Sequence, residues 1–369
     1  MATIALDATY TLDHEPTGVA TYCRGLIGGL ATLTKDHRFL LCYRLSRFGR
    51  RHEILRQAAP HLSRGPTFSI RAYQDLLTLW LPWQAQVFHS LVQRPPAFRF
   101  RKEVVTVHDL FTLTDHDYFT PQFRARFAAL LREAVARAAI TIVMSDYNAR
   151  QLVEHCGLPR EQIRIIPPGV DSPSVTLSRE DRLRERAKLV GEGKEMVLSV
   201  GAIQVRKNTL NALQAVSLLP PRYKLVLAGG NGHGSEAIHD FIRSEHLESR
   251  VIRLGYVPDE RLPALYQAAS VFLFPSLAEG FGFPLLEAMA YGIPAVASKT
   301  TSLPEVGGDA ALYADPRDPK DIAQHVRRAA EDVGLREHLV RRGLARVREF
   351  NWRRTAEQTC GVYEEVLAT

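Results

Sequence analysis

Residues 275–290 read PSLAEGFGFPLLEAMA, and this stretch decides how the second half of the chain folds. An apolar run at 271–274 predicts a β-strand that ends where the stretch begins. Gly280 and Gly282 allow the backbone to approach a ligand closely. Pro284 suits the first turn of a helix, whose free amides favour hydroxyls or anions. The stretch therefore predicts a strand, a ligand-binding loop and a helix start in direct succession.

Two carboxylates, Glu279 and Glu287, lie eight residues apart in this stretch. Glu279 belongs to the loop, and Glu287 lies about one turn into the predicted helix, near the same mouth. A carboxylate accepts two hydrogen bonds from neighbouring hydroxyls, which suits a sugar or a ribose. The alternative is an ordinary helix start with favourable acidic residues and a packing glycine.

The same alternation of strand and helix extends outward in both directions. The predicted strands lie at residues 4–8, 39–43, 87–89, 104–107, 140–144, 163–168, 196–200, 224–228, 251–254, 271–274 and 294–297. The predicted helices lie at residues 19–33, 123–139, 178–194, 208–218, 258–269, 284–291 and 353–367. Such alternation predicts an α/β fold with parallel sheets covered by helices on both faces.

Chain-breaking residues divide this pattern into two similar halves. Residues 167–173 read PPGVDSP, and the pattern restarts after them. The length of 369 residues also favours two domains. We expect one Rossmann-like domain at 1–172, a second at 173–352, and a last helix at 353–369. Two such domains would face each other across a ligand-binding cleft.

Glycines and polar residues gather at the predicted carboxyl ends of strands, where open parallel sheets bind ligands. They are Gly201, Gly229, Gly230, Gly255, Ser276 and His108. Arg206 and Lys207 also follow a strand, either as cations fixed for an anion or as a solvated pair. His108 is either a functional residue oriented by Asp109 or a core histidine, and His89 is a weaker candidate for lining an acceptor site.

Composition excludes several classes of protein. The four cysteines lie far apart, so neither a disulfide framework nor a zinc site is expected, and a reducing compartment fits. No apolar run approaches the roughly 18–20 residues of a membrane-spanning helix, and no signal peptide is expected. Most of the net charge of +7 lies in residues 1–172, which predicts an anionic partner for that half.

These motifs together resemble the large family of retaining GT-B glycosyltransferases with an E-x7-E pattern, glycosyltransferase family 4, and especially its mannosyltransferases. Glu279 and Glu287 meet that pattern. The other matching segments are GAIQVRKN at 201–208, LAGG at 227–230, GYVP at 255–258, SLPEV at 302–306, PGVD at 168–171, GVATY at 18–22 and TVHD at 106–109. The chain departs from many relatives at Gln204, where they have an acidic residue, and from some at Ala202, where they have arginine.

The resemblance implies roles for the site residues. Glu279 would contact hydroxyls of the transferred sugar, Glu287 would hold the ribose, and Arg206 and Lys207 would bind the diphosphate. Charge grows on the diphosphate as the glycosidic bond breaks, and two fixed cations stabilise that charge. Given the departures at Gln204 and Ala202, these two cations must supply most of that neutralisation, unless a basic residue of the first half helps.

Residues of both halves complete the expected site. His108 would contact the donor sugar and, with Glu279, Arg206 and Lys207, forms the expected catalytic group. The amide of Gly18 would approach the diphosphate, although a glycine at a helix start also suits an ordinary turn. The other expected donor-binding residues are Gly201, Gly229, Gly280, Phe281, Gly282, Phe283 and Leu286. No metal ion and no cofactor are expected, since the D-x-D sequence at 115–117 does not follow a strand.

The implied activity is transfer of a hexose from a nucleotide-sugar donor to a glycan or lipid-linked acceptor, with retention at the anomeric carbon. Mannose from GDP-mannose is favoured, and UDP-glucose- or dTDP-rhamnose-type donors are alternatives. A nucleotide-sugar 2-epimerase shares the architecture, but the E-x7-E segment argues against it. The last helix is expected to cross back onto the first domain, as in relatives.

A basic run in the first half raises a further possibility. Its arginines are Arg44, Arg47, Arg50, Arg51, Arg56 and Arg64. Trp80 and Trp83 follow, and tryptophan favours membrane interfaces. This surface either docks on an anionic membrane or is merely solvated. We expect a cytoplasmic protein, peripheral on the inner face of the membrane if the run docks. A non-enzymatic membrane- or nucleic-acid-binding protein is disfavoured by the intact donor residues, and no nucleic-acid partner is expected.

Overall fold

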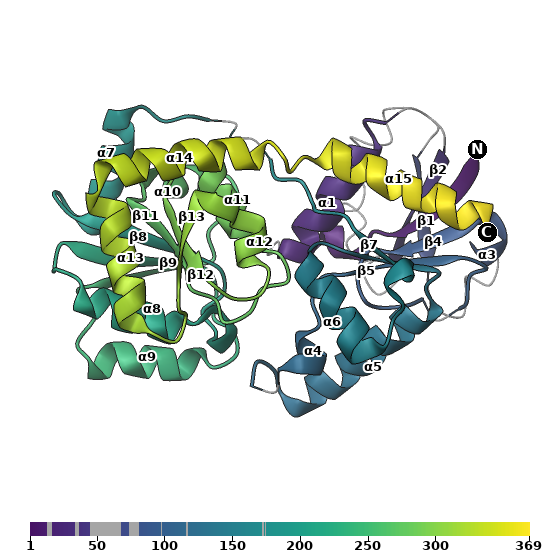
Figure 1. Ribbon diagram of the computed structural model, residues 1–369, viewed down its shortest axis with the longest axis horizontal. Helices are drawn as coiled ribbons and strands as arrows, with labels where there is room; N and C mark the ends of the chain where they lie inside the picture. The colour runs from purple at the N-terminus through teal and green to yellow at the C-terminus, as the bar shows by residue number, and fades with distance from the viewer. Residues whose placement is uncertain are drawn as a thin grey trace. The chain divides into compact units, whose positions relative to one another are not determined.

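The structure is a computed structural model that describes residues 1–12, 17–33, 37–44, 68–73, 81–96, 98–115, 117–171, 173 and 175–369. Arg47, Arg50, Arg51, Arg56, Arg64 and Trp80 of the predicted membrane surface lie outside these residues. The chain divides into two compact units (Figure 1). The first comprises Met1–His116, Thr120–Gly169 and Phe350–Thr369, and the second comprises Asp117–Phe119 and Val170–Glu349.

The first unit is built on a parallel sheet with the strand order β3-β2-β1-β4-β5-β6-β7. Its strands are β1 Ala2–Asp7, β2 His37–Arg44, β3 Phe68–Tyr73, β4 Val87–Ser90, β5 Glu103–Val107, β6 Ile140–Val143 and β7 Ile163–Ile165. Its helices are η1 Thr9–Leu12, α1 Gly18–Leu30, α3 Leu81–Gln84, α4 Phe111–Thr114, α5 Pro121–Arg137, α6 Asp146–Cys156, η3 Arg160–Gln162 and α15 Trp352–Ala368. The order reverses between β1 and β4, the position at which such sheets bind ligands.

The second unit repeats this plan with the order β10-β9-β8-β11-β12-β13, again all parallel. Its strands are β8 Glu195–Val200, β9 Tyr223–Ala228, β10 Val251–Gly255, β11 Val271–Phe274, β12 Ala295–Ser298 and β13 Ala311–Ala314. Its helices are α7 Arg179–Val190, η4 Val205–Lys207, α8 Thr209–Leu218, α9 Ser235–Ser244, α10 Leu262–Ala268, α11 Phe283–Ala290, α12 Leu303–Gly307, η5 Gly308–Ala310, α13 Pro319–Glu331 and α14 Val333–Val347. Here the order reverses between β8 and β11.

Helices cover both faces of the second sheet because successive strand residues point to opposite sides. Leu273 and its neighbours on one face pack with apolar residues of α8, α9 and α13 in one buried cluster. Phe272 points the other way, and its ring lies 5.7 Å from that of Tyr266 on α10. Strand β11 is therefore buried on both faces, which explains its continuous apolar run.

Helix α15 completes the first unit by packing on α1. The contact needs glycine. A Cβ added at Gly29 would lie 2.4 Å from the carbonyl oxygen of Trp352, and one at Gly169 would lie 2.3 Å from the amide nitrogen of Trp352. An added Cβ at Gly28, one residue away on α1, would meet nothing within 4 Å. The start of α15 thus lies close to the backbone of both α1 and the segment that follows β7.

A buried hydrogen-bonded chain ties α15 to the sheet as well. Tyr363 of α15 bonds Nδ1 of His89 at 2.7 Å, and His89 Nε2 bonds the hydroxyl of Thr106 at 2.9 Å. The Thr106 hydroxyl lies 3.1 Å from that of Tyr22 on α1. Burial, together with the smaller effect of nearby His108, lowers the pKa of His89 to about 3, so His89 is neutral and links core elements.

Most predicted elements are confirmed, with shifted ends. The helix predicted at 258–269 begins at Leu262, because Pro263 lacks the amide that a helix interior requires and fits only its first turn. The strand predicted at 163–168 ends at Ile165, ahead of two prolines. The elements that were not predicted are β3, β13, α6, α9, α12, α13, α14 and several very short helices.

Candidate functional site

The loops that follow β8 and β11 lie side by side, since these strands are neighbours where the strand order reverses. The β8 loop carries Arg206 and Lys207 on the short helix η4, and the β11 loop carries Glu279. The two loops are joined directly: the amide of Leu277 donates to the carbonyl of Arg206 at 2.9 Å. The position matches that at which open α/β sheets bind ligands.

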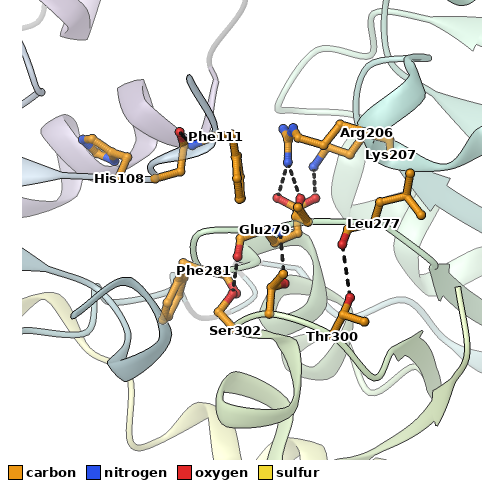
Figure 2. A network of polar contacts seen from close by, with 12 residues as sticks. His108, Phe111, Arg206, Lys207, Leu277, Glu279, Phe281, Thr300 and Ser302 are labelled. Carbon is orange, nitrogen blue, oxygen red and sulfur yellow. Dashed lines mark hydrogen bonds and ion pairs between the residues drawn. The ribbon is translucent and has the colours of Figure 1, made fainter. Parts of the chain in front are cut away.

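Both cations reach the same carboxylate (Figure 2). Arg206 Nη1 lies 2.9 Å from Glu279 Oε2, and Lys207 Nζ lies 2.6 Å from Glu279 Oε1. Arg206 Nη1 also donates to the carbonyl of Ala278 at 2.7 Å. The sequence places all three side chains at strand ends, and the structure brings them into one cluster, here called the ion-pair cluster.

The ion-pair cluster is mostly shielded from water. Burial raises the pKa of Glu279, but Arg206 and Lys207 lower it by more, to about 2. The carboxyl is therefore ionised at neutral pH, and the cluster carries a net charge of +1. Lys207 Nζ also lies 4.8 Å from the centre of the Phe274 ring, a cation–π contact that fixes the ammonium group further.

Hydroxyl groups hold the Glu279 loop in place (Figure 2). The Glu279 amide donates to the Thr301 hydroxyl at 3.1 Å. The Ser302 hydroxyl donates to the carbonyls of Glu279 and Phe281 at 2.8 and 3.0 Å. The Thr300 hydroxyl donates to the Leu277 carbonyl at 3.2 Å. These supports follow β12, and only Ser302 lay in a segment that the sequence singled out.

Asn208 anchors the other loop to the same region. Its backbone adopts a left-handed conformation with φ of 59°, which asparagine tolerates better than most residues. Its side-chain amide donates to the carbonyls of Pro275 and Pro316, at 2.9 and 2.6 Å. The residue ends η4 and so sets the direction of the two cations before it.

Two predicted glycines in these loops have conformations that require glycine. Gly229 has φ of 155°, and an added Cβ would lie 2.1 Å from the carbonyl oxygen of Gly201. Gly201 has φ of 139°, and its Cβ would lie 3.2 Å from Cε of Lys207. The loops after β8 and β9 therefore touch through backbone, and the Lys207 side chain passes across the bare α-carbon of Gly201.

Helix α11 begins at Phe283, one residue before the predicted start, with Pro284 in its first turn. Gly282 precedes it with φ of 113°, and a Cβ there would lie 2.6 Å from a methyl group of Leu303. The side chains of Phe281, Phe283 and Leu286 are buried. These buried apolar side chains anchor the loop and the start of α11 in the second unit.

Glu287 lies on α11 and is partly exposed. The Tyr266 hydroxyl donates to its Oε2 at 2.7 Å. Burial raises the pKa of Glu287, which Tyr266 opposes, and the carboxylates of Asp259 and Asp171 raise it further. Among the described residues nothing donates to Oε1, so this oxygen is available to a ligand. The sequence did not reveal Tyr266 as the residue that orients Glu287.

The first unit holds His108 directly after β5. His108 Nε2 lies 2.8 Å from the Leu91 carbonyl, and because a carbonyl only accepts, Nε2 carries the proton. Burial lowers the pKa of His108 to about 4, so the ring is neutral at pH 7 with an unprotonated Nδ1. Tyr22 of α1 packs edge-on against it at 5.1 Å, and exposed Gly18 opens the same helix.

Two other features that the sequence singled out, His89 and the D-x-D sequence at 115–117, take part in none of the site contacts described above. His89 bonds through both ring nitrogens inside the core, which leaves neither for an acceptor. Of the D-x-D sequence, Asp115 accepts from the neighbouring Thr114 hydroxyl at 2.5 Å, and His116 is outside the described residues. Within the described ranges, no group of three or more His, Cys, Asp or Glu side chains is placed to hold a metal ion. No helix there is long and apolar enough to cross a membrane.

Sequence comparison assigns both halves of the chain to known families. Residues 181–346 match the family described as Glycosyl transferases group 1, and residues 16–172 match Glycosyltransferase Family 4. The chain is 31% identical to O-antigen chain mannosyltransferase B of Escherichia coli, over 97% of its own length and 98% of that protein. The chain belongs to glycosyltransferase family 4.

Other relatives of this family 4 glycosyltransferase are longer or more distant. The serotype-specific mannosyltransferase WbdA of Escherichia coli is 33% identical over 72% of the chain, which spans 34% of that protein. The crystal structure of HepE from Anabaena in complex with UDP and glucose aligns over 99% of this chain and all of the other, with TM-score 0.78 and 21% identity. WaaG aligns with TM-score 0.68 and 16% identity. These structures establish the GT-B fold.

Proposed function

We propose that this protein is a retaining, metal-independent mannosyltransferase that uses GDP-mannose and extends a glycan or lipid-linked acceptor. The observation that carries the choice of sugar is the full-length match to O-antigen chain mannosyltransferase B. The ion-pair cluster at the end of β8 and β11 supports a site for a diphosphate, and the partly exposed carboxylate of Glu287 supports a nearby site for a diol.

Arg206 and Lys207 bind the diphosphate in this proposal. The ion-pair cluster has a net charge of +1, so a donor carrying two negative charges gains by sharing the cations with Glu279. Both cations are held by several contacts before the donor arrives, and little reorganisation is needed as charge develops on the leaving group. Glu279 remains ionised and accepts hydrogen bonds from the hydroxyls of the transferred sugar.

Glu287 binds the ribose through Oε1, with Tyr266 holding the opposite oxygen. His108 accepts a hydrogen bond from a sugar hydroxyl through Nδ1, because its proton is committed to the Leu91 carbonyl. Gly18 presents a backbone amide to the diphosphate, since a helix start has free donors and no Cβ shields this one. Each role uses a hydrogen-bonding group that is available in the described structure.

The proposed chemistry is a same-face substitution. The acceptor hydroxyl forms a bond to the anomeric carbon while the bond from that carbon to the diphosphate breaks. The electron pair of the breaking bond stays on the diphosphate, and a diphosphate oxygen takes the proton of the acceptor hydroxyl. Arg206 and Lys207 stabilise the departing charge, and no metal ion is required.

The test is a transfer reaction with a panel of GDP-, UDP- and dTDP-linked hexoses. We expect GDP-mannose to give the fastest transfer, and proton NMR of the fresh product to show the anomeric configuration of the donor. Faster transfer from UDP-glucose or dTDP-rhamnose would show that GDP-mannose is not the preferred donor, and the proposed glycosyl transfer would still hold. An inverted product would overturn the proposed retention, and nucleotide release without an acceptor would favour a 2-epimerase.

We further propose that the first unit docks on an anionic membrane. Trp83 lies on a short helix, is 90% exposed and lines a cavity of about 800 Å³. Arg99 and Arg101 line the same cavity, are exposed, and form no ion pair with a carboxylate of the described residues. An exposed tryptophan beside cations suits the boundary between lipid headgroups and acyl chains.

Co-sedimentation with vesicles tests this docking. Each basic residue near an anionic surface contributes about 1 kcal/mol, so binding to vesicles containing phosphatidylglycerol is expected, with loss at high salt. Replacing Trp83 with alanine, or Arg47, Arg50, Arg51 and Arg56 with serine, is expected to abolish it. Val153→Ala removes an exposed apolar residue elsewhere on the first unit and serves as the control. Equal sedimentation of all variants would contradict the membrane role.

A further inference from the structure

A second cavity lies in the second unit at the amino ends of the sheet strands, whereas the Glu279 loop lies at their carboxyl ends. Its volume is about 760 Å³, which is within the range of small-molecule sites. Glu195 begins β8, Ser270 precedes β11 and Pro294 precedes β12, and all three line it. Helices α7 and α14 supply the walls. The proposed donor residues follow the carboxyl ends of β8 and β11, so the two sites are separated by the length of the strands.

Arginine dominates the lining of this cavity. The six arginines are Arg179, Arg182, Arg186, Arg336, Arg341 and Arg348. Two carboxylates, Glu195 and Glu337, share the lining. Six cations against two anions leave the cavity with a strong positive charge.

Few of these cations are neutralised. Within the described part of the chain, Arg186 alone among the six forms an ion pair with a carboxylate, at 3.4 Å from Glu195. The Arg182 and Arg336 side chains donate to the backbone carbonyls of Leu177 and Ala330. The side chains of Arg179 and Arg348 make no hydrogen bond to any described residue. An anion entering the cavity would therefore meet cations with unused donors.

The arginines also affect one another. Burial lowers the pKa of Arg186, Glu195 opposes this, and the charge of Arg336 lowers it further. Helices α7 and α14 thus bring like charges close enough to repel. A bound anion would relieve that repulsion, and guanidinium groups bind phosphate with two parallel hydrogen bonds.

One wall of the cavity is apolar. Leu183 of α7 is 51% exposed and Leu344 of α14 is 43% exposed, and both line the cavity. Val340 and Ile293 lie in the same lining. Leucines this exposed lose contact with water only when something covers them, which favours a ligand with an apolar part beside its charge.

We propose that this arginine-lined cavity is a second, independent binding site for a phosphate-bearing molecule. Its phosphates contact the unpaired guanidinium groups, and its organic part lies against Leu183 and Leu344. The ligand is either a soluble phosphate ester or the diphosphate headgroup of an isoprenoid lipid, since both carry the same charged group. The site does not depend on the activity proposed for the ion-pair cluster.

Calorimetric titration of the full chain with inorganic pyrophosphate tests the site. Wild type is expected to show two classes of binding, one at the ion-pair cluster and one at the arginine-lined cavity. Lys207→Gln should remove the class at the ion-pair cluster. Arg179→Gln combined with Arg348→Gln should weaken the other class at least about ten-fold, the effect of losing one charge-assisted hydrogen bond. Neither arginine side chain forms a hydrogen bond to a described residue, so this double variant is expected to fold.

The control is Arg184→Gln combined with Arg327→Gln, which removes the same charge from exposed positions outside the cavity. If the control weakened pyrophosphate binding equally, the effect would come from the net charge of the protein and not from the cavity, and the proposal would be overturned. Two classes of unchanged affinity in the cavity variant, or a single class in wild type that the cavity variant retains unchanged, would overturn it as well. Titration with farnesyl diphosphate then separates the sources: tighter binding than pyrophosphate, lost in the cavity variant, indicates a lipid, and equal binding indicates a soluble phosphate.

Discussion

Replacing Lys207 with alanine is expected to lower kcat roughly 10²–10³-fold, the scale for losing one donor aimed at developing charge. Lys207 Nζ is held at 2.6 Å from Glu279 and at 4.8 Å from the centre of the Phe274 ring, so it is fixed before charge develops on the leaving diphosphate. Its loss also changes the ion-pair cluster from a net charge of +1 to zero. Steady-state rates with a saturating donor measure the effect.

Lys188→Ala removes the same charge from an exposed position on α7 and should leave kcat unchanged. A rise in KM with kcat intact would mean that Lys207 binds the donor equally in the ground state and the transition state, against the proposed role. EDTA should leave the wild-type rate unaltered. Activity lost in EDTA and restored by Mg²⁺ or Mn²⁺ would contradict the metal-independent account.

Gly29→Ala is expected to destabilise the first unit by about 2–3 kcal/mol, the usual scale of overpacking a close contact. The new methyl carbon would lie 2.4 Å from the carbonyl oxygen of Trp352, which is backbone and cannot rotate away. Helix α15 would have to move off α1, and the buried bond between Tyr363 and His89 would be strained with it. Thermal and urea unfolding followed by circular dichroism measure the loss.

Gly28→Ala provides the matched control at the next residue. Nothing lies within 4 Å of its added Cβ, and alanine favours a helix over glycine by roughly 0.5–1 kcal/mol. This variant should therefore be as stable as wild type or slightly more stable. If Gly29→Ala were equally harmless, the close approach of α15 to α1 would not contribute to the stability of the first unit.

The fold was predictable from the sequence wherever elements are strongly patterned. The strand at 271–274, the glycine loop and Pro284 determined β11, its loop and α11 to within one residue. Strand β13 was not predicted. Helix α6 begins with the polar sequence DYNARQ, in which only a narrow face is apolar, so its periodicity is weak.

The sequence indicates candidate site residues one by one, but it does not indicate their contacts. A strand end marks Arg206, Lys207 and Glu279 as candidates, yet their mutual bonding depends on β8 and β11 being neighbours, which is a matter of topology. Tyr266 was missed because it supports Glu287 from another helix and lies in no recognisable motif. The arginine-lined cavity draws its residues from 179–348 and has no local pattern at all.

The discontinuous composition of the first unit has a consequence for its biosynthesis. Residues up to Gly169 leave the ribosome long before Phe350–Thr369, yet both belong to that unit. Until Phe350–Thr369 have been synthesised, the glycine-lined surface of α1 and Nδ1 of His89 have no α15 to cover them. The second unit is continuous from Val170 to Glu349, apart from the three residues Asp117–Phe119, so nearly all of it emerges while the first is still incomplete. The segment Phe350–Thr369 thus completes a unit whose other residues are synthesised before nearly all of the second unit.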